Sequence, residues 1–154
     1  MPLSRTFIPY GAYWSTPFCR WQGALSGNHS LELAATVARE VLARRGIDPA
    51  LLDGIVLGMT VPQRGAFYGA PWLAGLIGAA GITGPTISQA CATSAAVLQA
   101  SAHAIETDAR RTVLAVACDR TSNGPHVYYP NPSGPGGKGE GEDVVWDSFN
   151  EDPH

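Results

Sequence analysis

The sequence predicts an α/β fold, with helices layered against a mixed, mostly parallel sheet. Two runs, residues 55–59 and 112–118, are almost entirely apolar, which is typical of strands covered on both faces. Segments with apolar residues at helical spacing alternate with these runs along the chain. Because parallel strands require a crossover between them, this alternation favours parallel pairing.

The elements before the first apolar run are a short strand and a long helix. Residues 5–13 alternate weakly between apolar and polar side chains, and a proline within them suggests an edge strand or a bulge. Residues 30–45 are predicted to be helical. Asn28 or Ser30 can cap this helix and Gly46 can end it. The apolar positions at helical spacing are Leu31, Ala34, Ala35, Ala38, Val41 and Leu42.

Shorter elements surround the strand at 55–59. Asp48 and Pro49 predict one helical turn before it, because Asp caps a helix and Pro suits its first position. A Gly- and Ala-rich helix is predicted at about 71–80, followed by a short extended segment at 85–88.

A second long helix is predicted at residues 92–107, directly after Cys91. Its alanines permit close approach of neighbouring elements. The strand at 112–118 follows and is predicted to be buried. The apolar stripe expected on the helix comprises Ala95, Leu98, Ala102 and Ile105.

The character of the chain changes at Asp119. Residues 123–141 are rich in Gly, Pro, Asn and Tyr and show no regular periodicity, as in long loops that are functional or disordered. Aromatic residues in this part favour order, because disordered linkers contain few of them. We therefore expect an α/β domain at residues 1–118 and the start of an ordered loop excursion at residues 119–154.

Length and charge exclude several classes of function. The 154 residues match one domain, and a hydrophobic content of 45% is sufficient for a core. A net charge of -3 provides no basic surface for nucleic acid or an anionic membrane. The longest apolar run, residues 72–82, is shorter than the about 20 residues that span a membrane, and the N-terminal residues lack a signal-peptide pattern. We expect a cytoplasmic protein with neither nucleic acid nor membrane as a partner.

No metal or phosphate site is predicted. Cys19, Cys91 and Cys118 are widely spaced and form no Cys-x-x-Cys pair or His/Cys cluster, so they are expected to be free thiols. The Gly-rich segment 134–143 lacks the residue order of a P-loop. Lys138 within it is interpreted as a solvated loop residue, with contact to a ligand phosphate as the alternative. The acidic residues after it are too widely spaced for a metal site.

Cys91 is the candidate for chemistry because it lies between a short strand and a helix. Free backbone N–H groups and the helix dipole stabilise a thiolate at this position. The dipole supplies only about 0.3–1 kcal/mol, so a nucleophile also needs a nearby base, and none is evident from the sequence position. The small neighbours Ala90, Ala92, Thr93 and Ser94 leave space for a ligand. The alternative is a small residue buried at a tight turn, the usual role of an unpaired cysteine.

The residues around Cys91 also resemble a known motif. The segment 87–94, Ile-Ser-Gln-Ala-Cys-Ala-Thr-Ser, is similar to the active-site cysteine motif of thiolases, where a small residue, Ser or Thr, and another small residue follow the nucleophile. Residues 16–18, 23–33 and 55–58 resemble other thiolase segments in the same order. The resemblance runs from about residue 5 to the end and implies a thiolase-like layered α-β-α half-fold with a long loop excursion.

This resemblance implies an acyltransferase that acts on CoA thioesters. Cys91 would hold the acyl group as a thioester during 3-ketoacyl-CoA cleavage or Claisen condensation. CoA thioesters are the substrates, so no separate cofactor and no metal is expected, and the residues that contact CoA stay unassigned. The family also uses an activating His, a second Cys and an Asn/His–water oxyanion hole, which lie in its C-terminal half.

The four histidines do not match the activating histidine of the family. His29, His103, His126 and His154 all lack its Gly-His-Pro setting. His103 lies twelve residues after Cys91, about 18 Å away on a helix that rises 1.5 Å per residue. Thiolases are much longer than this chain, and a further strand completes their sheet. We therefore expect the α/β domain to be incomplete, with a complementary C-terminal thiolase chain supplying the strand, the His and the Cys in a homo- or hetero-oligomer.

Two other functions stay open at this point. The alternative to the nucleophile-bearing subunit is a non-catalytic thiolase-like subunit that serves as the scaffold or binding half of a heteromeric acyl-CoA enzyme, which the motif alone does not exclude. A related condensing enzyme, such as a ketoacyl synthase, is disfavoured because residues 119–152 resemble the thiolase loop.

Overall fold

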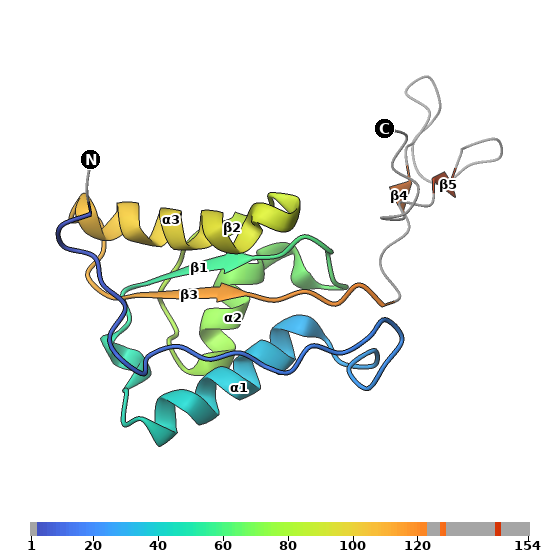
Figure 1. Cartoon of the computed structure of the whole chain (residues 1–154), viewed down its shortest axis with the longest axis horizontal. Helices are drawn as coiled ribbons and strands as arrows, with labels where there is room; N and C mark the ends of the chain where they lie inside the picture. The colour runs from blue at the N-terminus through green and yellow to red at the C-terminus, as the bar shows by residue number, and fades with distance from the viewer. Residues whose placement is uncertain (1–2, 123–126, 129–143, 146–154) are drawn as a thin grey trace.

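The computed structural model describes residues 3–122, 127–128 and 144–145 (Figure 1). The main elements are α1 (Ser30–Arg44), β1 (Gly54–Gly58), α2 (Gly69–Ile77), β2 (Thr86–Ile87), α3 (Thr93–Glu106) and β3 (Val113–Ala117). Three short 3-10 helices, η1 (Pro49–Leu51), η2 (Ala66–Tyr68) and η3 (Ala90–Ala92), lie between them. Two further strands, β4 (Val127–Tyr128) and β5 (Val144–Val145), pair with each other in antiparallel orientation.

The first three strands form one parallel sheet in the order β2-β1-β3. β1 is central and aligns with β3 along its whole length, from Gly54 opposite Val113 to Gly58 opposite Ala117. α3 covers one face of this sheet, and α1 and α2 cover the other (Figure 1). The predicted layered α/β architecture with parallel strands is therefore confirmed.

The core lies between the sheet and the pair α1 and α2. All five residues of β1 are buried, and Ile55 and Leu57 pack in one cluster with Leu31 of α1 and Leu73 of α2. Complete burial of such a side chain contributes about 1.5–3 kcal/mol to folding. The opposite face of the sheet is packed more closely, because β1 ends in Gly58. A Cβ atom at that position would lie 2.7 Å from the Cγ2 atoms of Thr93 and Val97 in α3.

Several predicted elements are confirmed with small shifts of their ends. The predicted turn is η1, where the Asp48 carboxylate accepts a hydrogen bond from the Ala50 N–H at 2.9 Å. The helix expected at 71–80 is α2, and the extended segment at 85–88 contains β2. Within the part of the chain that the structure describes, no helix is long and apolar enough to cross a membrane. The predicted order of residues 119–154 falls largely outside the described ranges.

Residues 5–13 do not form the predicted strand. The backbone N–H groups of Ser4, Arg5 and Thr6 instead donate to the Glu106 carboxylate at the end of α3, at 3.0, 2.8 and 2.8 Å. The Glu106 side chain thus accepts the hydrogen bonds that these backbone N–H groups would donate to a neighbouring strand in a sheet. The large apolar side chains of this segment are exposed: Leu3, Phe7, Ile8, Tyr10 and Tyr13.

The N-terminal cap of α1 is His29, and neither Asn28 nor Ser30 has this role. The Nδ1 atom of His29 accepts a hydrogen bond from the Leu31 N–H at 3.2 Å. His is a rarer cap than Asn or Ser, so residue preference alone pointed to the wrong neighbours. The predicted stop is confirmed, because Gly46 follows the helix with a φ of +64°.

The buried face of α3 is not the predicted apolar stripe. Its buried residues are Thr93, Val97, Ser101 and Ala102. Ala95 is exposed and Leu98 is 51% exposed. The buried hydroxyls satisfy their own hydrogen bonds, since Ser101 donates to the Val97 carbonyl at 2.8 Å. Apolarity was therefore a poor guide to which face of this helix is covered.

The strand β3 is less buried than predicted. Of its five residues only Leu114 is fully buried. β3 stands at the edge of the three-stranded sheet, and among the residues placed in the structure no strand pairs with its outer edge. The apolar run predicted a strand covered on both faces, whereas the expected incomplete sheet fits the one unpaired edge among the described residues.

Candidate active site

The carboxyl ends of the three parallel strands lie at one edge of the sheet. Gly58, the last residue of β1, is opposite both Ile87 and Ala117, the last residues of its two neighbours. The chain continues from these ends to Cys91 and Asp119, among others. Ligands of open α/β sheets bind outside the carboxyl ends of the strands, so this edge is the candidate site.

Asp119 fixes the loop that follows β1 to the loop that follows β3. One carboxylate oxygen accepts hydrogen bonds from the N–H groups of Thr60 and Val61, both at 2.8 Å. The other accepts from the Thr60 hydroxyl at 2.5 Å. This clamp gives the sheet edge a defined shape next to Cys91.

Cys91 lies in η3, between β2 and α3, and its side chain is exposed. The exposure argues against the alternative of a small cysteine buried at a turn. Ala90, directly before it, has a φ of +45°, a backbone conformation that non-glycine residues rarely adopt. No side chain caps the N-terminus of α3, and the Thr93 N–H at its start donates to the Ala90 carbonyl of the turn.

Thr93 closes this turn, a feature that the sequence did not reveal. Its hydroxyl oxygen accepts a hydrogen bond from the Gln89 N–H at 2.8 Å, and the hydroxyl donates to the Ala90 carbonyl at 2.7 Å. Thr93 is 5% exposed. The preference of hydroxyl side chains for the first turn of a helix was the available signal.

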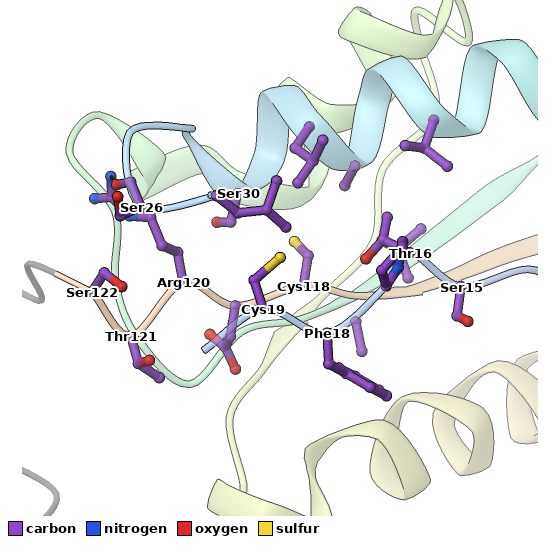
Figure 2. Close-up of a pocket in the computed structure, with 18 of the residues that line it drawn as sticks. Ser15, Thr16, Phe18, Cys19, Ser26, Ser30, Cys118, Arg120, Thr121 and Ser122 are labelled. Carbon is purple, nitrogen blue, oxygen red and sulfur yellow. Dashed lines mark hydrogen bonds between the residues drawn. The ribbon is translucent and has the colours of Figure 1, made fainter. Parts of the chain in front are cut away.

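A pocket of about 500 Å³ lies between residues 14–21, α1 and the end of β3 (Figure 2). Ser94, three residues after Cys91, lines it, whereas Cys91 does not. The wall is held together by two long-range hydrogen bonds. Arg120 donates to the Ser26 carbonyl at 2.9 Å, and the hydroxyl oxygen of Ser122 accepts from the Gln22 N–H at 2.8 Å.

The other two cysteines line this pocket, and all three are free thiols, as predicted. Burial, followed by the negative charge of Asp119, raises the pKa of the Cys118 thiol to about 12, against a smaller lowering by the Ser30 hydroxyl. Cys118 is therefore protonated and unsuited to nucleophilic attack. Cys19 is exposed. In the described ranges no three His, Cys, Asp or Glu side chains are grouped to hold a metal ion.

Two of the four histidines, His29 and His103, lie within the described residues. His29 caps α1, and its Nε2 atom donates to the Arg64 carbonyl at 2.9 Å. His103 lies in α3, near its C-terminal end. His126 and His154 fall outside the residues that the structure places. Neither described histidine is therefore assigned as a base for Cys91.

Comparison with known proteins decides the family. The family model described as the N-terminal domain of thiolase matches residues 12–148. The chain belongs to the thiolase family. This match covers both the Cys91 motif and the start of the loop excursion.

Individual relatives of this thiolase chain include an acyltransferase and a ketoacyl synthase. A probable acetyl-CoA acetyltransferase of Escherichia coli is 25% identical over 88% of the chain and 36% of that protein. A β-ketoacyl-[acyl-carrier-protein] synthase III of Roseiflexus castenholzii is 32% identical over 60% of the chain and 28% of that protein. The chain thus spans about a third of the length of these relatives.

A solved structure confirms the thiolase-like fold. Human mitochondrial 3-ketoacyl-CoA thiolase, solved in complex with CoA, superposes with a TM-score of 0.72 at 20% identity. The superposition covers 85% of this chain and 33% of that one. At this identity the likeness concerns the fold alone, and it confirms the predicted partial α/β thiolase architecture.

Proposed function

We propose that this chain is the nucleophile-bearing part of a thiolase, in which Cys91 transfers acyl groups between CoA thioesters. The observation that carries the proposal is the position of Cys91. Its side chain is exposed, and it lies directly after the strained residue Ala90 and just before α3. This place is at the carboxyl edge of the parallel sheet, in a chain of the thiolase family. We also propose that residues 1–118 are the incomplete catalytic domain of a cytoplasmic enzyme and that residues 119–154 begin its loop excursion.

The proposed reaction is covalent catalysis at sulfur. The Cys91 thiolate attacks the C3 carbonyl carbon of a 3-ketoacyl-CoA. The C2–C3 bond breaks, the acyl group stays on Cys91 as a thioester, and the departing enolate takes up a proton to become acetyl-CoA. A second CoA thiol gives its proton to a base and attacks this thioester, which releases a shortened acyl-CoA and the Cys91 thiolate. The reverse sequence is a Claisen condensation.

The proton transfers need an acid and a base, and neither is assigned among the described residues. We propose a complementary C-terminal thiolase chain that supplies the His and the second Cys. Two open surfaces support this partner: the outer edge of β3 and the outward face of α3, where Leu98 is 51% exposed. The chain spans about a third of the relatives, so about two thirds of their length is left for a complementary chain to supply.

Mass spectrometry tests the acyl-enzyme. The chain, together with any chain that co-purifies, is incubated with acetyl-CoA, quenched in acid and digested. We expect an acetyl group on the peptide that contains Cys91, its loss in Cys91→Ala, and unchanged labelling in the matched control Cys19→Ala. Labelling that persists in Cys91→Ala would refute the proposal.

Purification of the native protein tests the partner. We expect a second polypeptide that contains a Gly-His-Pro segment and a further cysteine but no nucleophile motif of its own. A partner with a complete motif would favour the alternative, in which this chain is a non-catalytic scaffold or binding subunit. An active monomer would contradict the requirement for a second chain.

A ketoacyl synthase is the second candidate, favoured by the 32% identity to the Roseiflexus relative. The two candidates differ in the acyl carrier and in reversibility. A synthase accepts the growing chain on acyl carrier protein, whereas a thiolase cleaves 3-ketoacyl-CoA with free CoA. Cleavage of acetoacetyl-CoA by the assembly, followed as loss of its absorbance, separates them.

A further inference from the structure

The turn that carries Cys91 is held in a strained conformation. Ala90 has a φ of +45°, which for a residue with a Cβ atom persists only where the surrounding structure enforces it. The Ala92 N–H donates to the Gln89 carbonyl at 2.9 Å and closes the backbone of the turn. A backbone bond of this kind forms in many turns, so it does not by itself select the unusual φ.

The Thr93 side chain makes the hydrogen bonds that favour this positive φ at Ala90. Its hydroxyl bonds to the backbone on both sides of the strained residue: it accepts from the Gln89 N–H at 2.8 Å and donates to the Ala90 carbonyl at 2.7 Å. Thr93 itself is 5% exposed, whereas Gln89 and Ala90 are exposed, so both bonds are partly buried. Loss of the hydroxyl leaves the exposed partners free to bond to water.

The position of Thr93 is itself fixed by the sheet. Its methyl group fits against Gly58 at the end of β1, where a Cβ atom would approach the Thr93 Cγ2 to 2.7 Å. The hydroxyl is thereby aimed at the turn while the methyl group rests on the strand. Thr93 therefore links the end of β1 to the turn that contains Ala90 and Cys91.

We propose that Thr93 is the positioning residue of the nucleophile: its hydroxyl holds Ala90 at positive φ and so places the Cys91 sulfur at the N-terminus of α3. This inference rests on the proposed function, because it concerns acyl transfer to Cys91. Misplacement of a reacting atom by about 1 Å can cost about 100-fold in rate. Loss of the hydroxyl therefore affects the acylation step more than the binding of acyl-CoA.

The experiment compares four variants in the full assembly. Thr93→Val keeps the shape and removes both hydrogen bonds, and Thr93→Ser keeps the hydroxyl. We expect the acetylation rate of Cys91 at saturating acetyl-CoA to fall about 10- to 100-fold in Thr93→Val, with the half-saturating concentration within about twofold. Thr93→Ser should restore the rate to within about threefold of the unaltered protein. A folded Thr93→Val that is acetylated at the unaltered rate would overturn the proposal.

A double variant separates positioning from general loss of stability. Glycine adopts positive φ without strain, so Ala90→Gly added to Thr93→Val should recover part of the lost rate, at least about threefold. Ala90→Gly alone is measured beside it as the reference for the double variant. No recovery in the double variant, with its fold retained by circular dichroism, would count against Thr93 acting through Ala90.

Alkylation by iodoacetamide keeps this inference distinct from the proposed function. If Cys91 is not acetylated in the unaltered protein, the proposed function fails, and the positioning claim is then judged on alkylation. The rate at Cys91 relative to Cys19 in the same sample should change more than about threefold in Thr93→Val and stay the same in Thr93→Ser. An unchanged ratio in Thr93→Val would overturn the positioning role.

Discussion

The Glu106 carboxylate accepts hydrogen bonds from both the backbone N–H and the hydroxyl of Thr6, at 2.8 and 2.9 Å. The same carboxylate takes the N–H groups of the two preceding residues. One side chain at the end of α3 therefore fixes the N-terminal segment, which pairs with no strand among the described residues. An ion pair between Arg5 and Asp108 also holds the segment, so its attachment depends on the charges of two carboxylates.

The attachment of the N-terminal segment should be lost in acid. The hydrogen bond from the Arg5 N–H is the largest of several that lower the pKa of Glu106 from 4.5 to about 2. Because the folded pKa is the lower one, the stabilisation is complete above about pH 4.5 and is lost as the pH falls towards 2. The amide NMR signals of residues 4–6 should titrate with a midpoint near pH 2. Glu106→Ala should loosen residues 4–6 at neutral pH, with the Arg5–Asp108 ion pair still present, whereas Glu40→Ala on α1 should not.

The Asp119 clamp should contribute measurably to stability. Asp119→Ala removes three hydrogen bonds to Thr60 and Val61, and bonds to a charged acceptor are worth about 1.5–3 kcal/mol each before solvent replaces them. Since Asp119 is exposed, we expect a net loss of about 1–3 kcal/mol in urea unfolding. Thr60→Val, which removes only one of the bonds, should cost less. Equal costs for the two variants would show that the backbone bonds contribute little.

Local patterns predicted the elements that are stabilised locally. The turn at Asp48 and the strand β1 follow from residue preference and apolar runs, and both are present. The place of Cys91 between a strand and a helix was also correct, because it depends only on the order of neighbouring elements. The fold class and the location of the nucleophile candidate could thus be predicted from sequence.

Features that depend on distant partners could not be predicted. Residues 5–13 have a strand-like pattern, but they form a strand only if another strand lies beside them. The resemblance did predict a sheet that lacks a strand, and β3 is an edge strand among the described residues. The role of Thr93 was missed because the prediction of the buried face counted apolar residues only and so placed hydroxyl side chains in solvent. Its hydrogen bonds to Gln89 and Ala90 become visible only in the three-dimensional structure.

The cap of α1 allows a direct test of sequence preference against structure. The His29 side chain caps α1 by accepting a hydrogen bond from the Leu31 N–H. Its ring also packs edge to face against Trp72, with ring centroids 5.0 Å apart. His29→Ala should destabilise the protein by about 0.5–2 kcal/mol, measured by thermal unfolding. His29→Asn should retain most of the cap. Asn28→Ala, at the position that the sequence favoured, should stay within about 0.5 kcal/mol of the unaltered protein.

The close packing of α3 on β1 should make Gly58 intolerant of a methyl group. A Cβ atom there would lie 2.7 Å from both the Thr93 and the Val97 Cγ2 atoms, so Gly58→Ala should cost about 1–3 kcal/mol through overpacking. Gly75 in α2 is the matched control, because a Cβ atom added to it would have no neighbouring atom within 4 Å. Gly75→Ala should be neutral or stabilising by up to about 1 kcal/mol. Similar effects of both substitutions on urea unfolding would contradict the close approach of α3.

The three thiols should differ in reactivity in a way that separates Cys91 from Cys118. Burial and the Asp119 charge raise the pKa of Cys118 from 9.0 to about 12, which lowers its thiolate fraction about 1,000-fold. Iodoacetamide at pH 8 should therefore modify the exposed Cys19 and Cys91 while Cys118 stays unmodified, as followed by peptide mass spectrometry. Asp119→Asn removes the negative charge and should speed the labelling of Cys118, with burial still keeping it the slowest of the three. In guanidinium chloride all three should react at similar rates, so a difference that survives unfolding would show that the folded environment is not its cause.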